Sequence, residues 1–287
     1  MKTFKGNGVV ITGAASGIGE ALARNLAAQG ARLLLADLHA ERLDAVAAEL
    51  RAGGTDCRAQ VCDVADAAAV QALAELALQA WGGADVLINN AGVGLMAPAQ
   101  SLDMADAHWL MNINFWGVVH GCRAFTPQLQ ARAARPEGSV IVNISSIFAM
   151  VSMPTQSIYN ASKAAVRGFS DALREELRDS GVRVLCVHPG GIKTRIAEQA
   201  RLGDISSVAD SAQEMHAQFD EIARTTAPQA AHAIVRALQG GRTRLLIGAD
   251  ATLGDWVYRL WPTRAAPWTA FLARRMRLRR QRAGGSP

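Results

Sequence analysis

Short, largely apolar runs alternate with longer stretches of helical periodicity along most of the chain. The apolar runs fall at residues 8–12, 31–36, 58–62, 86–89, 140–144, 183–187 and 245–247. Helical patterns lie between them, and the longest covers residues 104–132. Runs of about four to eight apolar residues are typical of strands buried on both faces of a parallel sheet. The alternation therefore predicts a doubly wound α/β fold with a parallel sheet of about seven strands.

The chain has 287 residues, which suits one α/β domain of roughly 250 residues and an extension. We expect the domain to cover residues 1–250 and the extension residues 251–287. No run of about eighteen apolar residues occurs, so no membrane-spanning helix is predicted. The segment Met1–Lys5 leads directly into the first apolar run without the core of a signal peptide. These features favour a cytoplasmic protein.

Composition argues against a nucleic-acid partner and against a metal site. The formal charge is +5, but eight arginines and no acidic residue follow position 258, so the first 258 residues carry a net charge of −3. A basic surface for nucleic acid is therefore not indicated on the body of the protein. The four cysteines and six histidines show no metal-binding spacing, which favours reduced core thiols and no metal.

A glycine-rich turn follows the first apolar run and opens a helical pattern. The turn reads Gly13-Ala14-Ala15-Ser16-Gly17-Ile18-Gly19, and the helix is expected to end at Gly30. Glycines let a backbone approach a pyrophosphate closely, and the amides and dipole of a helix N-terminus attract its negative charge. A strand, a glycine turn and a helix in this order predict a nucleotide-binding unit. Its candidate contacts are Gly13, Ser16, Gly17, Ile18 and Gly19.

Asp37 ends the second apolar run, 24 residues after Gly13. That spacing is close to the one expected of an acid that hydrogen-bonds the adenosine ribose of a dinucleotide. A carboxylate at this place repels the extra phosphate of NADP, and Ser16 and Leu38 stand where a basic residue could have compensated for it. The residue therefore favours NAD over NADP. The alternative is that Asp37 is a solvated turn residue.

Three side chains with acid–base chemistry lie within residues 146–163. Ser146 follows the apolar run 140–144, at the predicted carboxyl end of a strand, where open α/β sheets bind ligands. Tyr159 and Lys163 are four residues apart, so a helix places both on one face. A lysine cation near a phenol lowers a pKa that is ordinarily ~10. The set suits proton exchange with an alcohol or carbonyl oxygen, although Tyr159 and Lys163 alone also match an ordinary exposed helix pair.

Two further stretches carry amide side chains. The sequence Asn89-Asn90-Ala91-Gly92 ends the fourth apolar run, and this turn is expected to face the same ligand. Asn112 and Asn114 lie inside the helical stretch 104–132. Asparagine is unfavourable in the middle of a helix unless its amide or an opened backbone is used. The two asparagines therefore indicate that an amide side chain or an opened backbone is used within this helical stretch.

With these pieces in order, the chain resembles the short-chain dehydrogenase/reductase family over roughly residues 5–250. The matching residues are Thr12, Gly13, Gly17, Ile18, Gly19, Asn89, Asn90, Ala91, Gly92, Asn114, Ser146, Tyr159, Lys163, Pro189 and Gly190. The resemblance implies a Rossmann-like fold and an NAD(P)-dependent oxidoreductase that transfers hydride between a nicotinamide and a secondary alcohol or ketone. It also implies a homodimer or homotetramer that uses the helices around residues 104–132 and 157–180.

The resemblance also assigns roles to individual residues. It makes Tyr159 the acid–base group and Ser146 the group that orients the substrate oxygen. It makes Lys163 the group that lowers the pKa of the phenol and holds the nicotinamide ribose, while Asn114 holds a water that links Lys163 to solvent. The other implied cofactor contacts are Asp63 and Val64 at the adenine, Asn90, Ala91 and Gly92 at the cofactor wall, Pro189 and Gly190, and Thr194 at the nicotinamide carboxamide or phosphate.

Two rivals stand beside an NAD-dependent dehydrogenase. One is an NADP-dependent ketoreductase, and the other is an NAD(H)-binding sensor or scaffold without turnover. The complete set of Ser146, Tyr159, Lys163 and Asn114 argues against the sensor, because a scaffold has no need of an activated phenol.

The substrate is expected to be a lipophilic alcohol or ketone, long-chain or steroid-like. Apolar residues follow both Ser146 and the Asn-Asn-Ala-Gly turn, namely Ile147, Phe148, Ala149, Met150, Val151, Met153, Val93, Leu95 and Met96. If they line the pocket, it prefers an apolar substrate; equally, they fit ordinary core residues. Residues 195–224, which are polar and helical in pattern, stand where the family places a substrate lid.

The extension carries two apolar stripes at helical spacing. The first consists of Leu253, Trp256, Val257, Leu260 and Trp261, and the second of Trp268, Phe271, Leu272 and Met276. Arginines surround the second stripe. Tryptophan and arginine on an amphipathic helix are typical of an interfacial membrane anchor. The alternative is that the stripes dock on the body of the protein or on a neighbouring subunit.

Overall fold

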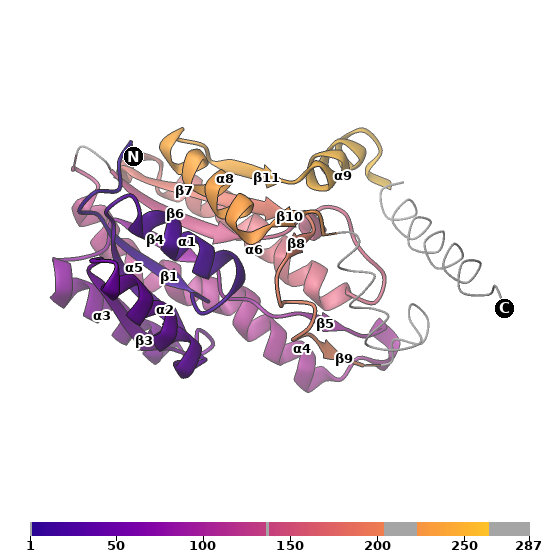
Figure 1. Ribbon diagram of the computed structural model, residues 1–287. Coiled ribbons are helices and arrows are strands. Elements are labelled where there is room, and N and C mark those ends of the chain that lie inside the picture. Colours follow the sequence, from indigo (N-terminus) through magenta and orange to yellow (C-terminus); the bar gives the residue numbers. More distant parts are fainter. Residues whose placement is uncertain (1, 136–137, 204–222, 264–287) are drawn as a thin grey trace.

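The computed structural model describes residues 2–135, 138–203 and 223–263 and contains a central parallel sheet (Figure 1). Its seven strands follow the order β11-β7-β6-β4-β1-β2-β3, and all neighbours are parallel. The strands are β1 (Gly8–Thr12), β2 (Arg32–Asp37), β3 (Cys57–Val61), β4 (Val86–Asn89), β6 (Ser139–Ile144), β7 (Val182–Pro189) and β11 (Arg244–Ile247). The strand order reverses between β1 and β4, which is where open α/β sheets bind ligands. The predicted seven-stranded, doubly wound fold is confirmed.

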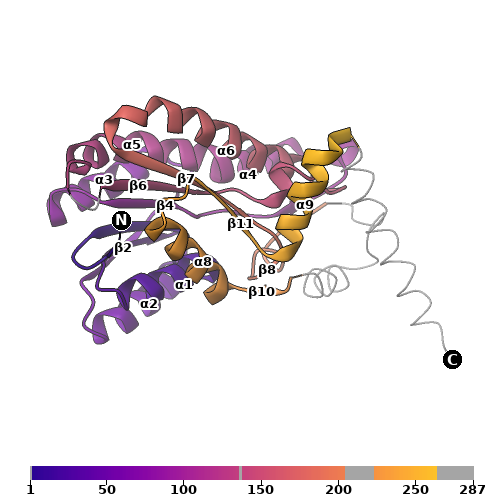
Figure 2. The same cartoon turned by 90° about the horizontal axis from the view of Figure 1, so that it is seen from above.

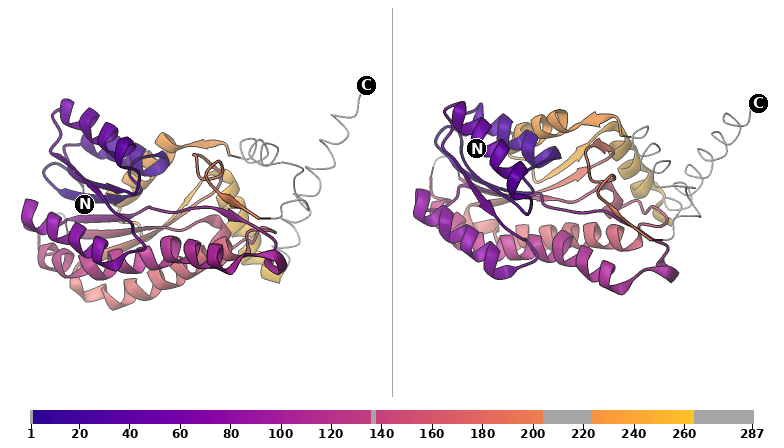
Figure 3. Two further views of the ribbon diagram at one scale, coloured as in Figure 1. Left: turned by 90° about the horizontal axis from the view of Figure 1, so that it is seen from below. Right: turned by 60° about the horizontal axis from the view of Figure 1, so that its bottom comes forward.

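Helices cover both faces of the sheet, as the view from above shows (Figure 2). One face carries α1 (Gly17–Ala27), α2 (Ala40–Ala52) and α8 (Ala227–Gln239). The other face carries α3 (Ala67–Trp81), α4 (Met104–Met111), α5 (Gly117–Arg132) and α6 (Ser157–Glu176). A further helix, α9 (Ala249–Leu260), lies at the end of the sheet toward which the strands point (Figures 1 and 3). No helix in the described part of the chain is long and apolar enough to cross a membrane.

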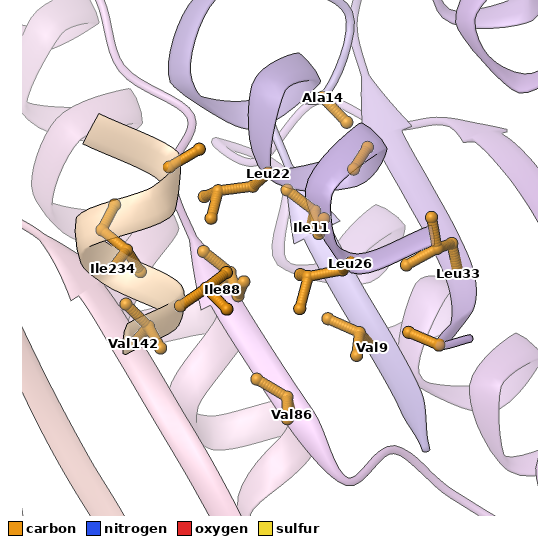
Figure 4. Packing of buried hydrophobic residues seen from close by; sticks show 14 of the residues in the cluster. Val9, Ile11, Ala14, Leu22, Leu26, Leu33, Val86, Ile88, Val142 and Ile234 are labelled. Atoms are coloured by element: carbon orange, nitrogen blue, oxygen red, sulfur yellow. The ribbon is translucent and has the colours of Figure 1, made fainter. Parts of the chain in front are cut away.

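Each face of the sheet has its own hydrophobic core, because successive side chains of a strand point to opposite faces. Val9 and Ile11 of β1 lie in the core beneath α1, together with Leu22 (Figure 4). Val10 of β1 points the other way and belongs to the second core, with Phe125 of α5. Burial on both faces explains why the runs that predicted the strands are continuously apolar.

The long helix predicted over residues 104–132 is interrupted in the structure. Helix α4 ends at Met111, a π-helical turn, η2, spans Asn112–Trp116, and α5 begins at Gly117. Single π turns inside α-helices are frequent at functional sites. The two asparagines marked the place of the interruption in the sequence, and the π turn is the opened backbone that makes their position tolerable.

Two small parallel strand pairs lie outside the central sheet. Strand β5 (Leu95–Met96) pairs with β9 (Arg201–Leu202), and β8 (Ile192–Lys193) pairs with β10 (Thr225–Thr226). The helical pattern expected over residues 195–224 is therefore wrong at 201–202, because hydrogen bonds with β5 hold these residues extended. Residues 204–222 of that segment lie outside the described part of the chain.

Candidate active site

The glycine-rich turn places the N-terminus of α1 at the carboxyl end of β1. Gly13 and Gly17 have φ angles of +65° and +57°, which side chains disfavour. Ser16 stands at the N-cap position in an extended conformation, and its side chain makes no capping hydrogen bond. The amides of the first turn are therefore not satisfied by this side chain and remain available to an anion.

Close packing also requires the glycines of this turn. A Cβ atom on Gly13 would lie 2.8 Å from the Cα of Ala91, and one on Gly19 would overlap the carbonyl oxygen of Gly13. The Asn90 amide fixes the turn by donating hydrogen bonds to the carbonyl oxygens of Thr12 (2.9 Å) and Gly13 (3.0 Å). The turn is thus a rigid cradle whose shape suits a dinucleotide pyrophosphate.

Asp37 at the end of β2 lies on the same pocket and connects two loops. Its Oδ2 accepts a 3.0 Å hydrogen bond from the amide of Ala15, and its Oδ1 accepts one of 3.0 Å from the amide of His39. Burial raises the pKa of the Asp37 carboxyl, while the Ala15 hydrogen bond and the positive charge of Arg42 act in the opposite direction. Arg42 also lines the pocket beside Asp37. No sequence motif marks this arginine, which lies five residues further on, in α2.

Asp63 and Val64, the two residues expected at the adenine, differ in their position relative to the pocket. Val64 is buried and lines the pocket, together with Cys62. Asp63 is exposed and does not line it, because its Oδ1 accepts a 2.9 Å hydrogen bond from the amide of Ala65 and turns the carboxylate into the following bend.

Ser146, Tyr159 and Lys163 come together at the carboxyl end of β6. Ser146 is the N-cap residue of a 3₁₀ turn, η3 (Ile147–Ala149), and its Oγ accepts a 3.1 Å hydrogen bond from the amide of Phe148. The same hydroxyl lies near the phenol of Tyr159 and lowers its pKa. Tyr159 and Lys163 stand one turn apart on α6, and all three residues line the pocket.

The electrostatics of this trio differ from the expectation that Lys163 lowers the pKa of Tyr159. Burial raises the pKa of Tyr159 to about 12, and the Ser146 hydrogen bond offsets only part of this effect. Burial also lowers the pKa of Lys163 to about 8. The Lys163 ammonium lies 5.8 Å from the centroid of the phenol ring and donates a 3.2 Å hydrogen bond to the carbonyl oxygen of Ile144. Desolvation therefore outweighs the attraction between ammonium and phenolate in this geometry.

Asn114 lies in the π turn and is fully buried, behind the pocket rather than on its wall. Its Oδ1 accepts a 2.8 Å hydrogen bond from the amide of Val93, and its Nδ2 donates one of 3.0 Å to the carbonyl oxygen of the same residue. A Cβ atom on Gly92 would lie 3.2 Å from the Asn114 Oδ1 and 3.4 Å from the Lys163 Nζ. Gly92 thus fits between the amide and the ammonium.

The loop after β7 closes the other side of the pocket. Pro189, Gly190 and Thr194 line it as predicted. A Cβ atom on Gly17 would lie 3.1 Å from the Cγ2 of Thr194, so this loop meets the glycine turn directly. A Cβ atom on Gly190 would overlap the carboxylate of Asp250, which shows why this position is a glycine.

These walls enclose a cavity of about 280 Å³. The apolar residues considered for it divide into two groups. Val93, Leu95, Met96 and Phe148 line the cavity, whereas Ile147, Met150 and Val151 are buried in a small separate core with Ala251. Further lining residues that the sequence did not single out are Gln156, Ile192, Ile196, Ala197, Gln199 and Ala200. Only the fold reveals them, because they come from loops without a motif.

The described residues contain no group of three or more histidine, cysteine or acidic side chains able to hold a metal ion. The arrangement instead brings a phenol, a hydroxyl and an ammonium to one end of a cavity whose other end is a nucleotide cradle. These groups can bind and protonate or deprotonate an oxygen atom beside a bound dinucleotide.

Comparisons with known proteins agree with this geometry. The sequence model described as short chain dehydrogenase matches residues 7–204. A protein of Mycobacterium tuberculosis named only as an oxidoreductase, SadH, is 38% identical over 263 residues, which cover 91% of this chain and 92% of that protein. The 1-deoxy-11-beta-hydroxypentalenate dehydrogenase of Streptomyces avermitilis is 35% identical over 261 residues, covering 88% and 89%.

Solved structures give the same result. A short chain dehydrogenase/reductase from Burkholderia phymatum, solved in complex with NAD, superposes with a TM-score of 0.78 at 31% identity. The superposition covers 91% of this chain and 96% of that one.

Proposed function

The chain belongs to the short-chain dehydrogenase/reductase family, and we propose that it transfers hydride between NAD(H) and a lipophilic secondary alcohol or ketone. Membership of the family makes it an NAD(P)-dependent oxidoreductase that acts on CH–OH groups. The observation that carries the proposal is that Ser146, Tyr159 and Lys163 line the same cavity as the nucleotide cradle and a group of apolar side chains.

The proposed roles of the site residues follow from their contacts. A bound nicotinamide supplies or accepts the hydride at the substrate carbon. In the reducing direction, the Tyr159 hydroxyl gives its proton to the carbonyl oxygen, and in the oxidising direction the phenolate takes the proton of the alcohol. The Ser146 hydroxyl, which lines the same cavity as the phenol, donates a hydrogen bond to the same oxygen. The Lys163 ammonium, one helical turn away, stabilises the phenolate when it forms.

Burial determines the protonation state of the Tyr159 phenol at neutral pH. With its pKa raised to about 12, the phenol is protonated at neutral pH and is ready to act as the acid in reduction. Asn114 does not touch the cavity, so we propose that it acts on Lys163 from behind, through its fixed position beside Gly92.

NAD is the proposed cofactor because Asp37 presents a carboxylate at the end of β2, where the adenosine ribose is expected. The remaining proposed contacts are Gly13, Ser16, Gly17, Ile18, Val64, Ala91, Gly92, Pro189, Gly190 and Thr194, which line the cavity. A second candidate is NADP. It is favoured by one observation, the guanidinium of Arg42 beside Asp37, since an arginine can pair with a 2′-phosphate.

We propose a lipophilic substrate because apolar side chains line part of the cavity. Val93, Leu95, Met96 and Phe148 contribute apolar surface, and Ile196, Ala197 and Ala200 extend it from the loop that follows Thr194. Gln156 and Gln199 are the uncharged polar groups of this region. Such a pocket is suited to an apolar body with one polar oxygen.

We also propose that the catalytic domain covers residues 1–250, followed by the extension 251–287, in a cytoplasmic homodimer or homotetramer. Assembly through α4, α5 and α6 is supported by two large apolar side chains, Met104 on α4 and Trp116 in η2, which are exposed in the single chain. Burial of such surface between subunits is favourable.

The test of the proposal measures kcat/KM for a homologous series of secondary alcohols with NAD and with NADP. We expect kcat/KM to rise with chain length and to be higher with NAD. Met96→Gln on the cavity wall should reduce the advantage of long alcohols, whereas Leu78→Gln, at an exposed position on α3 outside the cavity, should not. A preference for short polar alcohols in the wild type would refute the lipophilic assignment.

A further inference from the structure

Helix α9 has two faces of opposite character. Ala251, Gly254 and Asp255 are buried against the rest of the protein. Leu253, Trp256 and Leu260, together with Trp261 just beyond the helix, are between 53% and 59% exposed. We call these four residues the α9 outer face. Among the described residues, the members of the first expected stripe other than Val257 are therefore exposed and do not dock on the body of the chain. The second expected stripe, Trp268, Phe271, Leu272 and Met276, lies outside the described residues.

The inner face of α9 holds the segment that follows Ser146. A Cβ atom on Gly254 would lie 3.1 Å from Ile147 and 3.3 Å from Val151, so α9 approaches this segment as closely as a glycine permits. Ala251 belongs to the same small core. The helix is therefore rigidly placed relative to the 3₁₀ turn that carries Phe148 into the cavity wall.

An ion pair strengthens this placement. Arg244 of β11 binds the carboxylate of Asp255 at 2.5 Å and 3.2 Å, and its guanidinium also lies 3.0 Å from the sulfur of Met150. Arg259 binds the same carboxylate at 2.9 Å. Because α9, β11 and the segment after Ser146 are joined in this way, the outer face has a fixed orientation rather than that of a loose tail.

The outer face itself is uncharged, and the sequence that follows it is basic. Both acidic residues of α9 are engaged elsewhere, since Asp250 accepts a 2.6 Å hydrogen bond from the amide of Gly191 and Asp255 is held by its two arginines. The chain from Arg259 to its end contains eight arginines and no acidic residue. Two tryptophans, two leucines and this basic sequence form one continuous stretch of chain.

We propose that the α9 outer face is a docking surface for an anionic phospholipid bilayer. Tryptophan and leucine side chains are suited to the boundary between headgroups and acyl chains, and arginines are attracted to the negative surface potential. A second copy of the chain is the less suitable occupant. A symmetric contact would bring together two chains whose C-terminal sequences are both strongly basic, with eight arginines and no acidic residue from Arg259 onward.

Docking at this face brings the bilayer to the helix that packs against the segment carrying Phe148 of the cavity wall. The surface contact stands independently of the proposed function, since it rests on α9 and the sequence that follows.

The test uses the full-length protein and vesicles of phosphatidylcholine alone or mixed with phosphatidylglycerol. Trp256→Glu/Leu260→Glu removes the apolar contact and adds negative charge at two exposed positions. Leu78→Glu is the matched control, because Leu78 is an equally exposed leucine on α3, away from α9. Turnover of a soluble alcohol without vesicles verifies that each variant is folded.

We expect the wild type and Leu78→Glu to sediment with phosphatidylglycerol vesicles, and added salt to weaken the binding. The double variant should bind at least about tenfold more weakly while retaining turnover. Absence of wild-type binding, or equal binding by the double variant, would overturn the proposal. A lower oligomeric mass of the double variant in lipid-free solution, without vesicle binding by the wild type, would instead identify the face as a subunit interface. If the wild type itself showed no turnover of the alcohol, that would contradict the proposed function and leave the vesicle result unaffected.

Discussion

The side chain of Asn114 pairs with both polar atoms of the Val93 backbone, accepting from its amide at 2.8 Å and donating to its carbonyl at 3.0 Å. This pair joins the π turn to the loop that follows β4, two segments of the chain that share no other regular hydrogen bonding. Gly92, adjacent to Val93, lies against the Lys163 ammonium. The position of Lys163 therefore depends on an amide that never reaches the cavity.

Asn114→Ala should lower both stability and turnover. The substitution leaves the partly buried amide and carbonyl of Val93 without these partners, and a fully buried group left unpaired costs about 1–3 kcal/mol. Turnover should fall more than cofactor affinity, because Gly92 and Lys163 lose their support. Asn112→Ala, at an exposed position in the same π turn, should change neither property. Urea unfolding and kcat measured together check this prediction, and an Asn114→Ala protein with normal kcat would contradict the role given to the pair.

His188 should make the protein less stable below neutral pH. It is buried, and its Nδ1 lies 3.2 Å from the carbonyl oxygen of Ser146, which only accepts, so Nδ1 carries the proton. Burial lowers the pKa of His188 to about 4. In the unfolded chain the histidine pKa is ~6.5, so between pH ~6.5 and about 4 the unfolded state binds more protons than the folded state. The unfolding free energy therefore falls as pH decreases through this range.

His188→Asn isolates this effect, because asparagine can donate to the same carbonyl but does not titrate in this range. The nearby charges of Arg244, Arg167 and Asp171 are the same in both proteins. As pH falls from ~6.5 to about 4, the unfolding free energy of the wild type should decrease by roughly 3 kcal/mol relative to that of His188→Asn. A difference that is constant with pH would show that His188 does not titrate as described.

The pair Asp37 and Arg42 should set the choice between NAD and NADP. Asp37→Asn keeps an oxygen for the Ala15 amide but removes the negative charge, so the guanidinium of Arg42 is no longer opposed. The ratio of kcat/KM for NADP over NAD should rise by about tenfold or more, since the repulsion of the 2′-phosphate is relieved. Adding Arg42→Ala should reverse most of this gain. An unchanged ratio in Asp37→Asn would place the ribose elsewhere.

A buried ion pair far from the cavity should affect stability alone. Arg132 binds the carboxylate of Asp85 at 2.7 Å and 3.0 Å, and Asp85 also accepts a 2.8 Å hydrogen bond from the amide of Gly8. Arg132→Met leaves the buried Asp85 carboxylate with Arg135, whose Nη1 lies 3.5 Å away, as its remaining cationic partner. The unfolding free energy should fall by roughly 3 kcal/mol or more.

Combining Arg132→Met with Asp85→Asn removes the unpaired charge and should restore part of that stability, while kcat stays at the wild-type value in both proteins. If Arg132→Met were as stable as the wild type, the ion pair would contribute little to the unfolding free energy.

The sequence predicted the parts of the molecule that depend on local pattern. Seven apolar runs became the seven strands, and the glycine turn, Tyr159 and Lys163 lie together on one cavity. Asn89 and Asn143, which carry amides inside buried strands, face each other across β4 and β6 with a 2.9 Å hydrogen bond.

What the sequence missed depends on contacts between distant segments. Arg42 reaches Asp37 from a helix that contains no motif, and the pairing of β5 with β9 joins residues more than a hundred positions apart. The adenine contact expected of Asp63 stays a prediction, because its carboxylate is exposed and bonds to the Ala65 amide without lining the cavity. The pKa of Tyr159 was expected to be low from its spacing to Lys163, but spacing does not report burial, which dominates here.

The most direct test of the account compares the chain's two tyrosines, Tyr159 in the cavity and Tyr258 on α9. NADH formation from NAD and a long-chain secondary alcohol is followed for the wild type, Tyr159→Phe and Tyr258→Phe, with NADH binding measured separately. Tyr159→Phe should lose about 10²–10⁴-fold in kcat and keep its affinity for NADH, because only the proton carrier is removed. Tyr258→Phe should retain its activity. Near-normal turnover by Tyr159→Phe would contradict the central assignment.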